Sequence, residues 1–178
     1  DKVIVDSNVA PSVVALRVEK GEADGFGFAP EMTAADREAA QKDPKFAHYL
    51  IDAPATQVIW LNLNVHAAPL DKPAVRQAVA MAINRVHLVQ LLGGHAIAAT
   101  QMYNPYDSQY DPALVQKPVY PYDPRKAAAL LKSSGYHGQP INVLYANDLQ
   151  RNLSLAPGVL QDLQQIGLNV ALRGITDA

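Results

Sequence analysis

The segment 100–110, TQMYNPYDSQY, gathers side chains that suit the binding of a small charged molecule. It carries aromatic rings at Tyr103, Tyr106 and Tyr110 and a carboxylate at Asp107. Aromatic walls with one converging charge are typical of a small-ligand site. A partly desolvated Asp107 could hold an ammonium group through a charge-assisted hydrogen bond. The alternative is a solvated carboxylate in a surface loop, because long loops are usually exposed.

A second candidate group lies earlier in the chain, where Trp60, Asn62 and Asn64 alternate with apolar residues. A period of two places these three side chains on one face of a strand. In one interpretation this face looks into a cleft, and the indole of Trp60 stacks on a ligand. In the other, Trp60 packs under a helix and the Asn side chains hold the loop that follows the strand.

Other reactive patterns are missing from the sequence. The five His include no i, i+4 pair on one predicted helix and no HExxH motif, which disfavours a zinc hydrolase. There is no GxSxG motif for a nucleophile elbow, and no Cys for a disulfide or a thiolate metal site. We therefore expect no enzymatic activity, no catalytic residues, no metal and no cofactor.

The strand that carries Trp60 is predicted over 57–65, and an amphipathic helix is predicted over 71–84. Asp71 is expected to cap this helix, and Pro73 is tolerated in its first turn, where N–H groups lack helical partners. An apolar stripe at the helical period predicts the buried face of the helix. The stripe consists of Val75, Ala78, Val79, Ala82 and Ile83.

The remaining apolar segments alternate between helical and extended patterns, which predicts an α/β domain. Further helices are expected over 11–20, 33–41, 86–92 and 123–133, and one more runs to residue 166 with a break or kink at Pro157. Thr33 is a candidate cap, and Pro124 and Gly135 mark the start and end of one helix. Further strands are expected over 2–6, 24–28, 48–53, 141–145 and 169–175. Residues 97–117 are expected to be mostly loop.

Length and composition suit one domain, because 178 residues with 49% hydrophobic side chains can build a core. The net charge of −2, without a Lys/Arg cluster, argues against nucleic acid as a partner. No apolar run approaches the roughly 20 residues that span a bilayer, so no membrane insertion is expected. The opening DKVIVDS already reads as a strand, so we expect a segment of a longer protein.

Three motifs together resemble a known family of transport proteins. They are LNLNV with APLDKPAVRQAVAMAINR and the Gly pair at 93 and 94, YPYDPRKAAALLKSSGY at 120–136, and LQDLQQIGLNVALRGI at 160–175. In this order and spacing they resemble family 5 of the extracytoplasmic solute-binding proteins, the peptide, dipeptide and nickel receptors of ABC importers. A weaker match is ALRVEKGEADGFGFAP.

The resemblance implies a fold: a mixed-sheet α/β lobe of a type II, cluster C-like periplasmic binding protein, with helices packed on the sheet. Residues 1–178 would be a single domain, the second lobe of a two-lobed receptor whose first lobe is absent. The chain ends would lie close together, as is usual for inserted domains.

The resemblance also implies a function, which is to bind a peptide or similar small polar solute. The expected partners are this solute, the missing first lobe and the membrane subunits of an ABC importer. The expected location is periplasmic or extracytoplasmic, with a lipid anchor in a Gram-positive organism. The alternative is the sensor domain of a transcriptional regulator related to solute-binding proteins.

In peptide-binding members of this family, a carboxylate in the corresponding loop receives the α-amino group of the ligand, and an aromatic residue packs on it. Met102, Tyr103 and Asp107 match this pattern. The candidate ligand-binding residues are therefore Trp60, Asn62, Thr100, Met102, Tyr103, Tyr106 and Asp107.

Overall fold

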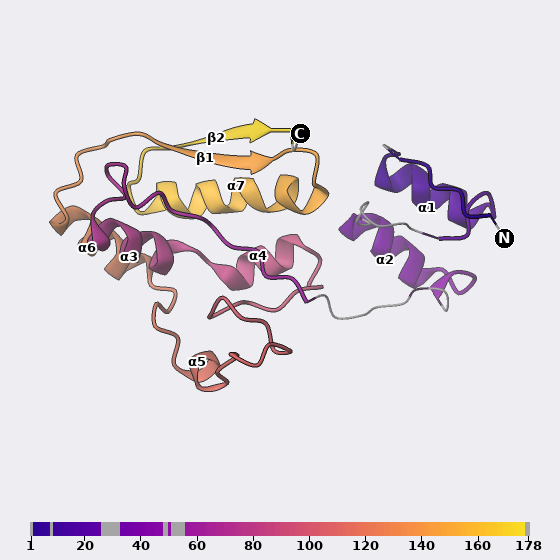
Figure 1. The fold of residues 1–178 in the computed structure, drawn as a ribbon, viewed down its shortest axis with the longest axis horizontal. Coiled ribbons are helices and arrows are strands. Elements are labelled where there is room, and N and C mark those ends of the chain that lie inside the picture. Colours follow the sequence, from indigo (N-terminus) through magenta and orange to yellow (C-terminus); the bar gives the residue numbers. More distant parts are fainter. Residues whose placement is uncertain (1, 8, 26–32, 48–49, 51–55, 177–178) are drawn as a thin grey trace.

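A computed structural model of the chain describes residues 2–7, 9–25, 33–47, 50 and 56–176. The described part combines helices with a small sheet, which confirms the predicted α/β class (Figure 1). The helices are α1 (Pro11–Glu19), α2 (Ala34–Lys42), α3 (Pro73–Ala82), α4 (Arg85–Leu91), α5 (Ala113–Gln116), α6 (Pro124–Ser133) and α7 (Gln150–Gln165). The strands are β1 (Ile141–Ala146) and β2 (Val170–Ile175).

Side-chain caps explain where two of the helices begin. Thr33 caps α2 and Asp123 caps α6, and each accepts the N–H of the third helical residue, at 3.1 and 2.9 Å. These bonds satisfy N–H groups that have no partner inside the helix. Pro124 opens α6, and Gly135 follows its end with a φ of 71°, a conformation that glycine adopts without strain. The predicted boundaries of both helices are confirmed to within one or two residues.

The sheet is a parallel pair in which Ile141 of β1 lies opposite Val170 of β2. Parallel neighbours need a crossover connection, and α7 supplies it. Figure 1 shows α7 lying along the sheet, and α7 contacts both strands. Pro157 lies within α7, yet the helix runs unbroken from Gln150 to Gln165, so the predicted break is wrong.

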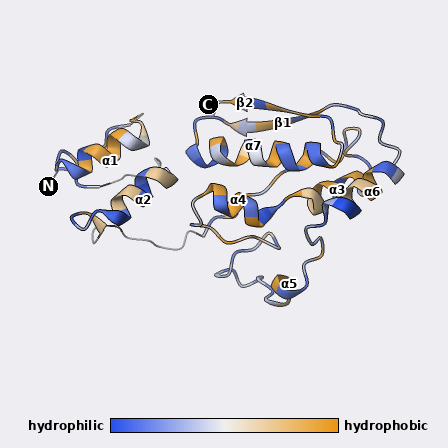
Figure 2. Cartoon of the chain, turned by 180° about the vertical axis from the view of Figure 1, so that it is seen from behind, coloured by the Kyte–Doolittle hydropathy of each residue, from blue (hydrophilic) through white to orange (hydrophobic). Residues whose placement is uncertain are grey.

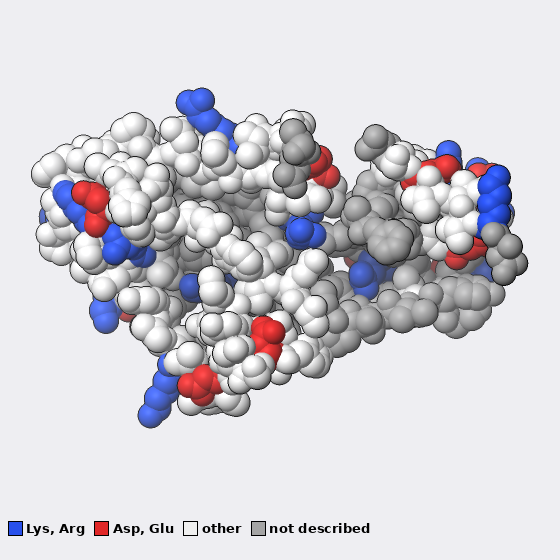
Figure 3. Space-filling view, in the orientation of Figure 1, with Lys and Arg blue, Asp and Glu red and all other residues white. Residues whose placement is uncertain are grey.

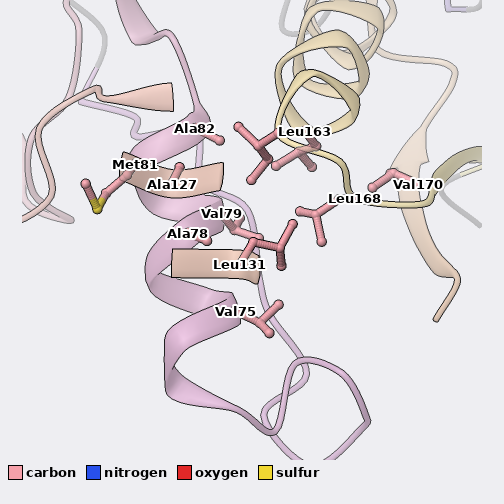
Figure 4. Packing of buried hydrophobic residues seen from close by; sticks show 11 residues of the cluster. Val75, Ala78, Val79, Met81, Ala82, Ala127, Leu131, Leu163, Leu168 and Val170 are labelled. Carbon is pink, nitrogen blue, oxygen red and sulfur yellow. The ribbon is translucent and has the colours of Figure 1, made fainter. Parts of the chain in front are cut away.

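The core lies where α3, α6 and α7 meet (Figure 4). Ala78 of α3 and Ala127 of α6 are fully buried, so their small side chains let the two helices pack closely. Leu163 of α7 faces this pair from the other side and is only 2% exposed. The predicted stripe on α3 is confirmed. Figure 2 shows α7 with hydrophobic and hydrophilic colours along its length, as expected for a helix with one buried face.

Two predicted strands, 2–6 and 57–65, are wrong, because both segments lack strand pairing in the structure. Val3 and Ile4 are 88% and 72% exposed, and Ile59 is 49% exposed. Alternating apolar residues indicate which face of a strand is buried, but a strand forms only where a neighbour pairs with its N–H and C=O groups. The described part of the chain places no such neighbour beside either segment. The predicted strands 24–28 and 48–53 fall mostly outside the described residues.

The start of α3 also differs from the prediction, because Lys72 rather than Asp71 is the N-cap and no side chain caps this end. Pro73 is the first helical residue, as predicted, and a proline forces the residue before it into extended backbone. The non-helical cap position therefore falls on Lys72. Its Nζ donates to the carbonyl of Gly135 at 2.8 Å, which ties α3 to the end of α6.

The first and last described residues do not lie side by side. Figure 1 draws the segment that leads into α1 well away from the end of β2. The expectation of neighbouring ends is therefore not met. The α1–α2 pair contacts the larger body near Gly93, where an added Cβ would lie 3.0 Å from the Cβ of Ala34.

The hydroxyl of Tyr136 links the segments that lead into β1 and β2. Removal of this hydroxyl tests the link. The Tyr136 hydroxyl donates to the carbonyl of Gln139 and accepts the N–H of Asn169, both at 2.8 Å. We expect Tyr136→Phe to lower the free energy of unfolding by about 1 kcal/mol, since the freed groups can bind water in part. Chemical denaturation measures this, with Tyr122→Phe at an exposed ring as control. Equal stability of both variants would contradict the link.

Candidate functional site

The loop with the candidate site residues presents most of them to solvent. Met102, Tyr103 and Tyr106 are 64%, 44% and 65% exposed, and Asp107 is exposed as well. Thr100 is half-buried. The predicted loop is confirmed over most of 97–117, with only the short α5 inside it. These side chains form an open surface, which would become a binding cleft only if a second surface covered it.

Asn104 organises this loop from within. The Asp107 carboxylate accepts, through Oδ2, the backbone N–H of Asn104 at 2.9 Å and its Nδ2 at 2.6 Å. The Oδ1 of Asn104 accepts the N–H of Tyr106 at 2.9 Å. One oxygen of Asp107 is therefore used to shape the loop, and an ammonium group would bind through Oδ1.

Our reading of the sequence missed Asn104. The signal was present, because Asn before Pro commonly bonds to backbone groups two residues on and starts a turn. The burial of Asn104 to 8% exposure shows that it is part of the framework of the loop.

The second candidate group lies on the segment 57–65. Trp60 is 57% exposed, so the interpretation that it packs under a helix is wrong. Asn62 is exposed too. Asn64 accepts the N–H of His66 at 3.1 Å, which confirms the interpretation that it holds the following loop.

The structure links the two candidate groups through the backbone before Trp60. The Nδ2 of Asn104 donates to the carbonyl of Thr56 at 3.3 Å. At its far side the loop closes on itself, because Gln101 exchanges two hydrogen bonds with the backbone of Asp111 at 2.8 and 3.0 Å. The aromatic loop is therefore bonded to the backbone at Thr56, four residues before Trp60.

A shallow hollow of about 290 Å³ lies elsewhere, between the ends of α6 and α7. None of the candidate ligand-binding residues lines it. Its lining consists of Ala128, Leu131, Lys132, Tyr136, His137, Gly138, Ile166 and Gly167. The hollow and the candidate surface are separate features of the fold.

Arginines near α3 have structural partners. Arg85 donates to the carbonyl of Ala80 at 3.1 Å. This carbonyl lies near the C-terminal end of α3, where the helix dipole favours a cation. Burial lowers the pKa of the Arg85 guanidinium, which nevertheless stays charged at neutral pH. Arg76 donates to the carbonyls of Leu70 and Asp71 at 2.8 and 2.9 Å. These contacts give both arginines structural roles at the two ends of α3.

Charged side chains are scattered over the face drawn in Figure 3, with Lys and Arg interspersed with Asp and Glu. Within the described ranges, no group of three or more His, Cys, Asp or Glu is placed to hold a metal ion. No helix there has both the length and the apolar composition needed to cross a bilayer.

Comparison with known proteins matches the whole chain to one family. The family model of bacterial extracellular solute-binding proteins, family 5 Middle, matches residues 1–178. A glutathione-binding protein GsiB from Pectobacterium atrosepticum is 32% identical over 172 residues, which is 94% of this chain and 30% of that protein. The GsiB of Salmonella typhimurium is 37% identical over 120 residues, 65% of this chain and 22% of its own length. The chain thus spans less than a third of the length of each of these two curated relatives.

Solved structures share the fold. The substrate-binding protein CtaP of an ABC transporter from Listeria monocytogenes has a TM-score of 0.71 at 20% identity, covering 98% of this chain and 34% of its own. The DppA of Helicobacter pylori, solved with the peptide STSA, has a TM-score of 0.68 at 24% identity, covering 94% and 31%. Because the family model matches residues 1–178, this chain belongs to family 5 of the bacterial extracellular solute-binding proteins.

Proposed function

We propose that this chain is one wall of a solute-binding cleft, the second lobe of a two-lobed receptor that serves an ABC importer. The solute is a peptide or a similar small polar molecule. The observation that carries this proposal is the exposure of Trp60, Tyr103 and Tyr106 on two segments that Asn104 holds together. A cluster of exposed aromatic side chains, such as Tyr103 and Tyr106 in one loop, marks a surface that binds something.

The chemistry of this wall suits a peptide. The tyrosine rings and Trp60 offer flat apolar surfaces, and Oδ1 of Asp107 can accept a hydrogen bond from an α-amino group. Residues 57–63 pair with no strand in the described part of the chain, so an extended peptide could bond to them as an added strand does. Binding of this kind needs no covalent step, and we propose that the protein is not an enzyme.

The relatives support the same function. Two are named for glutathione, itself a small peptide, and DppA was solved with a bound peptide. The matched family model describes the middle part of such proteins, and the chain spans 30% of the Pectobacterium relative. We therefore propose that the first lobe is supplied by the rest of a longer receptor. Its location would be periplasmic, or at the cell surface through a lipid anchor.

The transcriptional-regulator alternative gains no support, because every relative named above is a solute-binding protein. The complete gene separates the two possibilities. A secretion signal or lipid-attachment motif ahead of this region fits a receptor, whereas a helix-turn-helix segment would contradict our proposal.

Calorimetry with glutathione and the peptide STSA tests the proposed function. We expect the full-length receptor to bind at least one of them, and the isolated 178-residue chain to bind about 100-fold more weakly, since half of the contacts are missing. Binding by the isolated chain as tight as that of the full-length receptor would contradict the idea of a half-site. Failure of the full-length protein to bind either probe would contradict the proposed class of solute.

A further inference from the structure

Asn104 differs from the residues around it in the aromatic loop. It is 8% exposed, whereas Tyr103 and Tyr106 are 44% and 65% exposed. A buried amide is costly unless its donors and acceptor are paired. Those of Asn104 are paired: Nδ2 donates to Asp107 and Thr56, and Oδ1 accepts from Tyr106. Oδ1 therefore bonds within the loop, whereas Nδ2 bonds both to the loop and to Thr56 in another segment of the chain.

The partners of Asn104 are the backbone and side chains that place the candidate ligand contacts. On one side the amide fixes the backbone at Tyr106 and one carboxylate oxygen of Asp107. On the other it holds Thr56, in the segment that leads to Trp60. Because neither segment belongs to a helix or strand, regular backbone bonding does not fix their relative position. The side chain of Asn104 supplies a bond between them.

We infer that Asn104 is a positioning residue, which holds the aromatic loop and the Trp60 segment in one arrangement and thereby sets the affinity for the solute. This inference rests on the proposed function for its effect on affinity. Its effect on the two segments can be measured without any ligand. Asn104 itself need not touch the solute, since it acts through Tyr106, Asp107 and Trp60.

The variant Asn104→Asp isolates the hydrogen bonding, because it preserves the volume of the side chain. It places a carboxylate against the Asp107 carboxylate and the Thr56 carbonyl, so two attractions become repulsions. Asn104→Ala removes the same bonds without adding charge. The matched control is Asn152→Ala, which removes another Asn amide that donates to a backbone carbonyl, Ala146 at 3.2 Å, at the start of α7.

The first measurement uses the 178-residue chain, in which Trp60 is the only tryptophan. Hydrogen exchange by mass spectrometry and the fluorescence anisotropy of Trp60 report on the two segments. Both Asn104 variants are expected to speed exchange about tenfold in 103–110, where the N–H of Tyr106 is bonded to Asn104, and to lower the anisotropy of Trp60, whereas Asn152→Ala leaves both unchanged. A loss of thermal stability in the Asn104 variants, without faster exchange in 103–110 and without lower anisotropy of Trp60, would overturn the inference.

The second measurement uses the full-length receptor with glutathione and STSA as probes. Asn104→Asp is expected to weaken binding roughly tenfold, while Asn152→Ala changes it less than about twofold. Unchanged affinity in Asn104→Asp, with normal binding by the parent protein, would overturn the inference. If the parent protein binds neither probe, the proposed function fails, and the exchange experiment still decides whether Asn104 positions the two segments.

Discussion

Leu163→Ala is expected to lower the free energy of unfolding by about 2–5 kcal/mol, the largest effect of any single truncation considered. Leu163 is among the largest fully buried side chains and lies between α7 and the α3–α6 pair, as Figure 4 shows. Its loss removes apolar burial and leaves a cavity that three packed helices close only in part. A chain of this size would then melt roughly 10 °C lower, which calorimetry or circular dichroism detects.

The matched control is Leu153→Ala, the same truncation in the same helix at a side chain that is 42% exposed. This variant should lower the free energy of unfolding by less than about 1 kcal/mol, because little apolar surface loses its burial. Similar losses for the two variants would show that Leu163 does not lie at the centre of the core.

Asp162→Ala is expected to lower the free energy of unfolding by about 2 kcal/mol, the second-largest effect among the substitutions considered. Asp162 is 6% exposed, and its Oδ2 accepts the backbone N–H of Asn84 at 2.8 Å. Asn84 is the N-cap of α4, so this bond joins α7 to the junction between α3 and α4. Alanine leaves the N–H without its acceptor in a partly buried place.

Asp162→Asn serves as the control, because it keeps an oxygen at the same distance along the side chain and replaces only the charge. We expect it to retain more than half of the stability lost in the alanine variant, as measured by urea denaturation. If Asp162→Asn is as unstable as Asp162→Ala, the hydrogen bond to Asn84 is not what makes Asp162 important.

Helix positions could be predicted from the sequence because their signals are local. Pro124 and Gly135 bracket α6 with two residues whose backbone preferences act on their immediate neighbours. The apolar stripe on α3 was predicted correctly for the same reason, since its residues share one face at the helical period. The strands 141–145 and 169–175 were also predicted correctly, because each is a short apolar run next to a clear turn.

The failed strand at 57–65 shows the limit of this reasoning. Its alternation is as regular as that of a true strand, but pairing depends on a neighbour that sequence spacing does not reveal. The cap at Asp71 failed for a different reason. Asp is a good capping residue, yet Pro73 places the cap position at Lys72.

The candidate surface was predictable in composition but not in its bonding. Aromatic residues around one carboxylate indicated the loop, and the structure leaves the rings of Tyr103 and Tyr106 exposed. Asp107 gives one oxygen to Asn104, and Asn104 reaches Thr56, 48 positions earlier in the chain; both contacts depend on how the loop folds back. Contacts of this kind follow no sequence periodicity from which they could be predicted.

A crystal structure of the full-length receptor, purified from its host with the solute it retains, tests the central claim most directly. We expect the solute between two lobes, with at least Trp60 or Asp107 within about 4 Å of it. A solute bound away from 57–65 and 100–107, or a pocket formed by this chain alone, would contradict the claim that these residues form one wall of a shared cleft.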